Sequence, residues 1–419
     1  MIRSMFTAIS SLNLHQKYLD VVSNNLANAN TTGYKSSRVM FQDQFAQMLA
    51  PGSAPTTAQG GTNPTQIGLG VGMGFVSPDF TQGTLQSTGR NLDLGVEGDG
   101  FFVYGQDAGR RYSREGSMGL DADGYLVNAA TGLRTQGWTA DATGAVDTNA
   151  PVDDIKIDSS KSLAKATANV ALGGNLSANT DGTGTVNVTM GVYDSLGALQ
   201  QAAVRFTRGG AAGAPTNVWT WQVMDTTATP PVAGTGTGTV TFDANGQLST
   251  TTPPTVTTAA TIPGSAGSTT PIPVTLDFAK MTQLTSATSA TVTSQDGLAA
   301  GTVTDVYISP SDGGVSLVYS NGLSEKIGQV ALARFTNPAG LMQSEGTTFI
   351  AGLNSGDAQI GAAASGGRGT IASGHLEASN VDMAQEFTNM ILAQRGFQAS
   401  SRVITTSDEI LQELVNLKR

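Results

Sequence analysis

Apolar residues recur at helical spacing along the N-terminal end of the chain. Over residues 2–27 they fall on one side of a helix with 3.6 residues per turn. This stripe consists of Ile2, Met5, Phe6, Ile9, Leu12, Leu19, Val22 and Leu26. The pattern predicts an amphipathic helix over 2–27.

The C-terminal end repeats the pattern over a longer span. Its apolar residues alternate in steps of four and three, with polar Gln394, Ser401 and Asp408 at intervening positions. A helix from 381 to 417 would be about 55 Å long, and Gly396 would weaken it by about 1 kcal/mol. The predicted coiled-coil-like seam consists of Met383, Phe387, Met390, Phe397, Ile404, Leu411 and Val415.

The helical pattern disappears between these ends. Residues 81–138 and 303–350 have short apolar runs separated by Gly, Asn and Asp turns, a pattern typical of antiparallel strands. Residues 209–279 contain no Lys or Arg, yet Trp219 and Trp221 lie in an alternating pattern that predicts a buried strand face.

These patterns divide the chain into nested parts. We predict a mixed, mainly β fold, with paired terminal helices flanking two nested β-rich domains in an elongated subunit. Residues 1–30 and 376–419 form the helical domain, and 31–80 an extended connector. Residues 81–159 and 296–375 form one β-domain, into which 160–295 are inserted as an outer β-domain.

Composition excludes several functions. The net charge of −10 argues against a nucleic-acid surface, and two His with no Cys exclude the usual zinc sites, thiol nucleophiles and disulfides. No apolar run reaches 18 residues, so we expect no membrane insertion. The N-terminal residues lack the apolar core of a secretory signal peptide, so we expect no cleaved leader.

Candidate chemical motifs are weak. The glycines at 68, 70, 72 and 74 complete no phosphate-binding motif, and Asp121-Ala-Asp123-Gly124 fits a hairpin turn better than a calcium loop. His15, placed on the polar side of its helix, and His375 have no identifiable catalytic partners. We therefore expect no catalytic residues, no metal, no cofactor and no enzymatic activity.

The two amphipathic ends favour assembly. Either helix alone is marginally stable, and pairing them buries only one stripe of each. The remaining apolar side chains, such as Phe6, Ile391 and Ile410, need other partners, which neighbouring subunits could supply. An ordinary intramolecular helical hairpin that caps the β-domains is the alternative.

Specific strings resemble one family. NNLANANTTGYK at 24–35 resembles the N-terminal motif of bacterial flagellar axial proteins, the rod and hook proteins. Segments 81–103, 112–138 and 319–341 are similar to their shared β-domain, and 376–419 is similar to their C-terminal helix. The ends of the insert, at 173–180 and 276–288, resemble those of hook proteins.

The resemblance implies a helical homopolymer, a flexible, curved, hollow tube that transmits motor torque from rod to filament as a universal joint. The terminal helices would line the tube, and Asn24, Asn25, Asn28, Asn30 and Gly33 would form the helix exit. The resemblance also implies an extracellular location in the flagellar hook, and export through the flagellar type III apparatus.

Partners follow from the same resemblance. They would be further copies of the chain, the distal rod, the hook–filament junction, the hook cap, the hook-length ruler and the export apparatus. Phe41 and Phe45 resemble a short export signal, although two apolar anchors of the connector would look the same. Two alternatives stay open: a distal rod protein with a large insertion, and a secreted surface adhesin.

Overall fold

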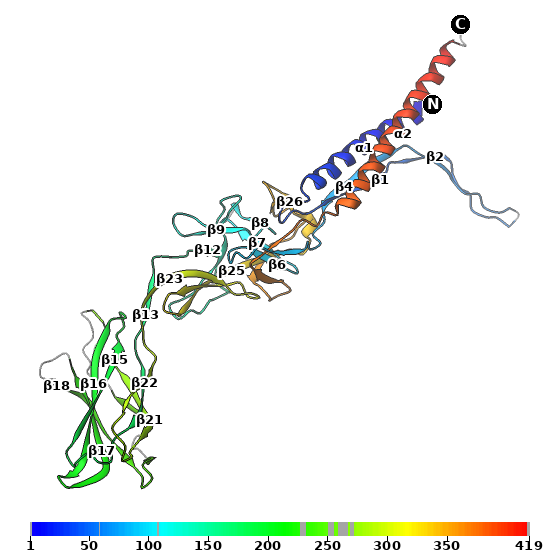
Figure 1. The fold of residues 1–419 in the computed structure, drawn as a ribbon. Coiled ribbons are helices and arrows are strands. Elements are labelled where there is room, and N and C mark those ends of the chain that lie inside the picture. Colours follow the sequence, from blue (N-terminus) through cyan, green and yellow to red (C-terminus); the bar gives the residue numbers. More distant parts are fainter. Residues whose placement is uncertain are drawn as a thin grey trace. The chain divides into compact units, whose positions relative to one another are not determined.

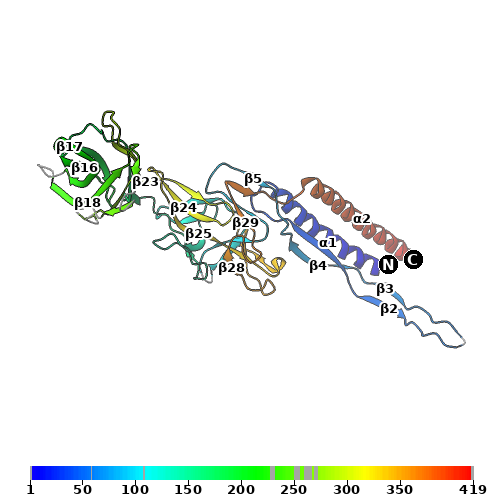
Figure 2. The ribbon, with the colours of Figure 1, turned by 90° about the horizontal axis from the view of Figure 1, so that it is seen from below.

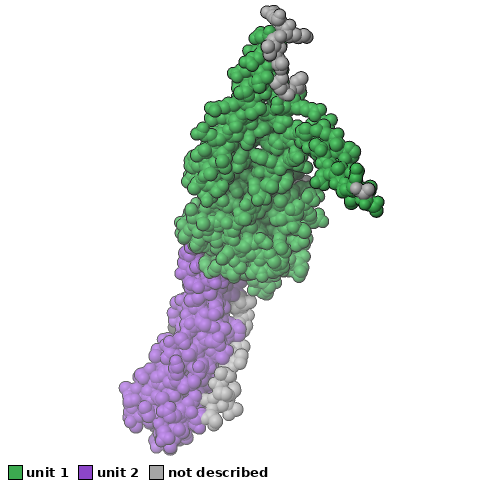
Figure 3. Space-filling model, turned by 90° about the vertical axis from the view of Figure 1, so that its right-hand side faces the viewer, with its two compact units in different colours: residues 1–157, 306–316, 325–419 green, residues 158–305, 317–324 purple. Residues whose placement is uncertain are grey.

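A computed structural model describes residues 2–57, 59–106, 109–226, 232–249, 255–258, 267–268 and 272–416. The chain divides into two compact units, coloured separately in Figure 3. Unit 1 comprises residues 1–157, 306–316 and 325–419, and unit 2 comprises 158–305 and 317–324. The fold is mainly β with one long helix at each end, which confirms the predicted fold class.

The two terminal helices form an antiparallel pair in unit 1. Helix α1 spans Ile2–Ala27 and helix α2 spans Met383–Asn416, close to the predicted bounds. Asn25, near the end of α1, donates through Nδ2 to Oε1 of Glu386, near the start of α2, at 3.4 Å. Nearer the middle of both helices, Ser400 Oγ donates to Ser11 Oγ at 3.0 Å. Figures 1 and 2 show the start of α1 and the end of α2 at one end of this pair.

The predicted connector contains two antiparallel ribbons. β1 (Ser37–Asp43) pairs with β4 (Val71–Pro78), and β2 (Ala46–Ala50) pairs with β3 (Thr65–Gly68). The β1–β4 ribbon contacts α1 (Figure 1). Backbone pairing thus satisfies the N–H and C=O groups of a segment whose sequence is rich in Gly, Pro and Thr.

The β-domain of unit 1 is organised around β25, which pairs with β7, β11 and β28. From β7 the sheet continues through β8 and β27 to β26, and β9–β10, β6–β29 and β5–β30 form separate pairs. Its elements, some of which extend into unit 2, are β5 (Leu85–Ser87), β6 (Leu94–Glu97), β7 (Phe101–Tyr104), β8 (Arg111–Ser113), β9 (Met118–Leu120), β10 (Leu126–Asn128), β11 (Gln136–Thr139), β12 (Asp153–Asp154), β24 (Gly314–Tyr319), β25 (Ser324–Arg334), the short 3₁₀ helix η2 (Pro338–Gly340), β26 (Met342–Gln343), β27 (Thr348–Ile350), β28 (Gln359–Ala362), β29 (Thr370–Ser373) and β30 (His375–Glu377).

Unit 2 is a sandwich of two sheets. The five-stranded sheet has the order β15-β16-β17-β18-β19, and the four-stranded sheet β20-β21-β14-β22, in which β14 and β21 are parallel. Trp219 and Trp221 are fully buried between the sheets with Phe278, which confirms their predicted place in a core. The strands of these two sheets are β14 (Asn169–Asn175), β15 (Thr185–Tyr193), β16 (Leu199–Ala211), β17 (Ala214–Asp225), β18 (Val232–Phe242), β19 (Leu248–Ser249), β20 (Thr255–Thr258), β21 (Val274–Thr282) and β22 (Thr291–Gln295). Outside them, β13 (Ser162–Lys165) pairs with β23 (Leu298–Ile308).

One turn design recurs in both units. An Asp carboxylate accepts hydrogen bonds from the backbone N–H groups two and four residues later in the chain, and the Gly three residues later has a positive φ. Side-chain closure of this kind replaces the missing backbone bonds of a tight loop. The first case is the hairpin predicted at 121–124. The turns begin at Asp121, Asp141, Asp194 and Asp243.

Candidate assembly surface and buried junction

Small side chains form the seam between the two helices. Ala393, Ser400 and Ser407 are buried at seven-residue spacing on α2, opposite a face of α1 that includes the buried Leu14 and Val22. Small residues at an interface let two helices approach closely, as Gly and Ala do wherever backbones come into contact. The seam within the subunit therefore lies beside the stripe of large apolar residues.

His15 and Gly396 mark the closest approach of the helices. A Cβ atom added to Gly396 would lie 2.4 Å from Cε1 of His15. The His15 ring also contacts Phe41 edge-on, with centroids 6.0 Å apart. The prediction that His15 lies on a polar face was wrong, because the ring fills the space that the missing side chain of Gly396 leaves.

The large apolar residues of the predicted assembly surface fall into three groups. Val22 is buried, while Met5, Leu12, Leu19, Leu26, Met390, Phe397, Ile404 and Leu411 are half-buried beside the seam. Ile9, Met383, Phe387 and Val415 are exposed. The side chain of Ile2 lies outside the described residues.

Further exposed apolar side chains extend this surface. Those of Ile391 and Leu392 are 57% and 62% exposed, and Phe6, Val403 and Ile410 are exposed as well. Leu392 and Val403 lie off the four-three alternation, so sequence periodicity did not single them out. Large apolar groups in such numbers on one helical pair indicate a surface that another molecule covers.

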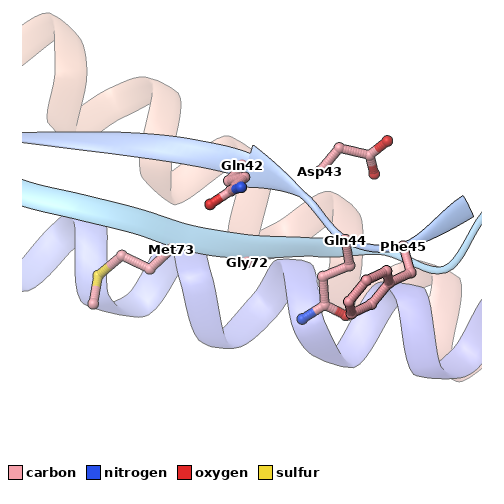
Figure 4. Close-up of a pocket in the computed structure, with 6 residues that line it drawn as sticks. All are labelled: Gln42, Asp43, Gln44, Phe45, Gly72 and Met73. Atoms are coloured by element: carbon pink, nitrogen blue, oxygen red, sulfur yellow. The ribbon is translucent and has the colours of Figure 1, made fainter.

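The two Phe residues of the proposed export signal have different environments. Phe41, on β1, packs edge-on against Tyr18 of α1, with ring centroids 5.6 Å apart. Phe45 follows β1 and is 88% exposed. Figure 4 shows Phe45 beside a hollow that Gln42, Gln44 and Met73 also line. Phe41 thus anchors the ribbon to the helix, whereas Phe45 is free in the subunit.

The ribbons carry a second exposed apolar surface. It consists of Met48, Leu49, Ile67, Leu69, Met73 and Phe75. These residues come from β2, β3, β4 and the loop between the last two, within 30 residues of sequence. The ribbons therefore add to the apolar area that the helices expose.

The helix exit is organised by Asn25, which is 1% exposed. Its Oδ1 accepts the N–H of Ser37 at 2.9 Å and the hydroxyl of Tyr34 at 3.2 Å, and its Nδ2 donates to the carbonyl of Ser37 at 2.9 Å. A single side chain thus replaces strand-like pairing and holds the connector against the end of α1.

The other residues of the predicted exit take different roles. Asn28 donates to the carbonyl of Asn24 at 2.9 Å, while Asn30 is exposed. Gly33 has φ 68°, and a Cβ there would lie 2.6 Å from the backbone nitrogen of Glu115. Only glycine fits that position without a shift of the backbone.

Charged groups are buried where the predicted connector meets the β-domain of unit 1. Lys35 Nζ lies 2.7 Å from Glu377 Oε1, and both side chains are 0% exposed. Arg114 Nη1 lies 3.3 Å from Glu377 Oε2, and Gly83 N–H donates to Oε1 at 2.8 Å. Glu377, the last residue of β30, thus joins the predicted connector, through Lys35, to the β-domain of unit 1, through Arg114 and Gly83. Sequence periodicity gave no signal for this junction.

Burial dominates the electrostatics of the junction. It lowers the pKa of Lys35 and of Arg114, and the facing carboxylate of Glu377 opposes both shifts. Removing one partner of such a group leaves an uncompensated buried charge, which costs about 3–5 kcal/mol. The junction therefore depends on all three side chains together.

Within the described residues, no three His, Asp or Glu side chains gather as metal ligands would. None of the described helices has the length and apolar character needed to cross a membrane. The candidate functional features of the described residues are the exposed apolar surface and the buried ionic junction.

Three family models match segments of the chain. Residues 5–35, which cover most of α1 and the helix exit, match the model described as "Flagella basal body rod protein". Residues 156–298 match "Flagellar basal body protein FlaE D2 domain", and residues 372–417 match "Flagellar basal body rod FlgEFG protein C-terminal".

Whole-chain relatives agree with these matches. The flagellar basal-body rod protein FlgG of Bacillus subtilis is 30% identical over 100% of both chains. The flagellar hook protein FlgE of Salmonella typhimurium is 34% identical over 99% of this chain and 100% of its own. That of Borreliella burgdorferi is 36% identical over 100% of both. The chain belongs to the family of flagellar hook proteins.

Proposed function

We propose that the chain is a structural subunit of the bacterial flagellar hook, and that it polymerises through the apolar side chains exposed on α1 and α2. The carrying observation is that Phe387, Ile391 and Leu392 remain exposed after the two helices have paired. Pairing of the two helices thus buries the seam residues and leaves a second apolar surface exposed for contact with neighbouring copies.

The free energy gained by burying these apolar side chains supports assembly through this surface. Burying a large apolar side chain fully contributes about 1.5–3 kcal/mol, so each half-exposed one contributes about 1 kcal/mol more when a neighbour covers it. Several such side chains per subunit offset the repulsion between copies that each carry a net charge of −10. Polymers should therefore form more readily as salt screens that repulsion.

The helical pair forms the inner layer of a hollow tube, and the β-domains lie outside it. The tube bends as a universal joint because its outer contacts are weak and exchangeable, a role suited to the low charge of residues 209–279. The buried junction at Glu377 transmits torque between the helices and the β-domain of unit 1, since charged hydrogen bonds fix its geometry.

A pair of substitutions tests the assembly surface. Ile391→Ser removes an exposed apolar side chain from α2, while Gln398→Ser changes an exposed polar residue two turns further along. We expect Ile391→Ser to raise the critical concentration for polymer formation about fivefold or more, as a loss of about 1 kcal/mol implies. Gln398→Ser should leave it within twofold. Equal effects of the two variants would contradict the proposal.

The second candidate is a distal rod subunit. The full-length match to the rod protein FlgG favours it. Electron microscopy of assembled chain separates the two, because curved tubes support the hook and straight tubes the rod. An adhesin requires neither form.

The remaining partners are proposals from the same family resemblance: the distal rod, the hook–filament junction, the hook cap, the hook-length ruler and the export apparatus.

We propose that export proceeds through the flagellar type III apparatus with Phe41 and Phe45 as its signal. Export acts before folding, so Phe45→Ala should reduce secretion without loosening the ribbon. Normal secretion of Phe45→Ala and Phe41→Ala would contradict this signal. The proposed role is mechanical and involves no catalysis.

A further inference from the structure

A small cavity in unit 1 lies beside the buried junction. Its volume is about 150 Å³. Arg114 and Arg334 line it together with Asp99 and the rings of Phe80, Phe101 and Phe335. We call it the arginine cavity. Its walls combine two guanidinium groups with apolar surface, which is the composition of a site for an anion that carries an apolar portion.

Buried cations beside the cavity have few carboxylate partners, and Asp99, the carboxylate that lines the cavity, is largely exposed. Arg114 and Lys35 are both buried, and they share the single carboxylate of Glu377. The Arg114 side chain is 3% exposed, and its Nε has no hydrogen-bond partner among the described residues. The Phe101 ring, 5.2 Å from Cζ of Arg114, compensates only part of the desolvation. A buried cation with an unused donor therefore faces a cavity large enough for a small anion.

Arg334 provides a second guanidinium with spare donors. Its Nε lies 3.9 Å from Asp99 Oδ2, which is beyond hydrogen-bond range. The Arg334 side chain is 43% exposed and that of Asp99 is 74% exposed, so water screens their attraction. Asp99 therefore leaves hydrogen-bond donors of the Arg334 guanidinium available to a ligand.

We propose that the arginine cavity binds a carboxylate group, which accepts hydrogen bonds from Arg114 and Arg334. Arg114 shares Glu377 with Lys35, and Asp99 reaches the charge of Arg114 only from an exposed position. A carboxylate matches the planar fork of a guanidinium and would accept a hydrogen bond from the unused Nε–H of Arg114. The carboxylate comes either from a small free organic acid or from an acidic side chain of a second copy in the polymer. The second source rests on the proposed function, whereas the site itself does not.

Acetate, with acetamide as its neutral isostere, tests the site in the monomeric chain. We would follow the arginine Nε–H signals by ¹⁵N NMR during titration at constant ionic strength. We expect a buried Nε–H signal to shift saturably with acetate and not with acetamide. Arg334→Gln should weaken acetate binding about tenfold, as the loss of a charge-assisted partner implies.

Arg90→Gln is the matched control, because Arg90 is exposed and also lies 3.9 Å from one carboxylate, that of Asp93. It should bind acetate as the natural chain does. No saturable shift in the natural chain, or equal affinity in Arg334→Gln, would overturn the site.

The assembled chain distinguishes the two sources. If a neighbouring copy supplies the carboxylate, the polymer should no longer bind acetate, and Arg334→Gln should raise the critical concentration more than Arg90→Gln does. If the ligand is a free acid, polymer and monomer should bind acetate equally. A chain that binds acetate but never polymerises would contradict the proposed function and leave the site supported.

Discussion

The contact between His15 and Gly396 gives the sharpest prediction about the helical pair. Intrinsic propensity alone says that Gly396→Ala should stabilise α2 by about 1 kcal/mol. In the structure, the added Cβ would lie 2.4, 2.5 and 2.8 Å from three atoms of the His15 ring. The ring cannot move freely, because it packs between α2 and Phe41.

The magnitude follows from two opposing terms. Overpacking of this kind costs about 1–3 kcal/mol, which offsets or exceeds the gain in helix propensity. We therefore expect Gly396→Ala to destabilise the helical pair by up to about 2 kcal/mol. In a His15→Ala background the clash is absent, and the same substitution should stabilise by about 1 kcal/mol. The coupling between the two sites should be about 1–3 kcal/mol.

Hydrogen exchange is the suitable assay, because a chain of two units does not unfold in one step. Opening free energies of amides in α1 and α2 would be measured for both single variants, the double variant and Thr405→Ala. Thr405 is exposed on α2 and its hydroxyl donates to the carbonyl of Arg402 in the same helix, so its substitution reports local terms within α2. If Gly396→Ala stabilised both helices in the natural chain as Thr405→Ala does, the close approach of the helices would be refuted.

Three further predictions concern the junction and unit 2. Glu377→Gln should cost unit 1 about 3–5 kcal/mol of unfolding free energy in urea, while Glu97→Gln, at an exposed site, should cost less than about 0.5 kcal/mol. Gly33→Ala should destabilise more than Gly89→Ala, which has a similar positive φ but open space around it; equal losses would refute the close backbone contact. Burial would raise the pKa of Asp296, but the N–H groups that donate to its carboxylate outweigh burial and hold the pKa below the ordinary 3.8. Its contribution to the stability of unit 2 is therefore present above pH 3.8 and is lost as pH falls through the lower folded pKa, so Asp296→Asn should flatten acid unfolding in that window.

The sequence predicted the elements that depend on local pattern. Both helices begin and end within two residues of the predicted bounds wherever the structure describes them, because their apolar spacing is regular over many turns. The hairpin at Asp121 was predicted because Asp and Gly occupy the positions that the turn requires. The burial of Trp219 and Trp221 in the core was predicted because residues two positions apart on a strand lie on the same face of the sheet.

The packing of the helices was harder to predict. Periodicity selects large apolar residues, whereas the buried seam of α2 consists of Ala393, Ser400 and Ser407, which carry little hydrophobic signal. Large residues such as Phe387 remain exposed in the subunit, so their pattern reports a surface for further contacts. An apolar stripe on a single chain does not say which partner covers it.

The junction and the ribbons depend on long-range contacts. Lys35 and Glu377 are separated by 342 positions in sequence, and no local pattern pairs them. The connector was predicted as extended chain because Gly and Thr dominate it, yet its strands pair through backbone groups that side-chain patterns do not reveal. Gly33 was included in the exit motif, but the reason that this position requires glycine is the backbone of Glu115, which lies far along the chain and would clash with a Cβ atom.

Electron cryo-microscopy of the assembled chain would show which surface of the helical pair neighbouring copies cover. We expect a curved hollow tube in which α1 and α2 line the channel and Phe387, Ile391 and Leu392 are buried against neighbouring copies. A polymer whose helical pairs face solvent, with these three side chains exposed, would contradict this expectation.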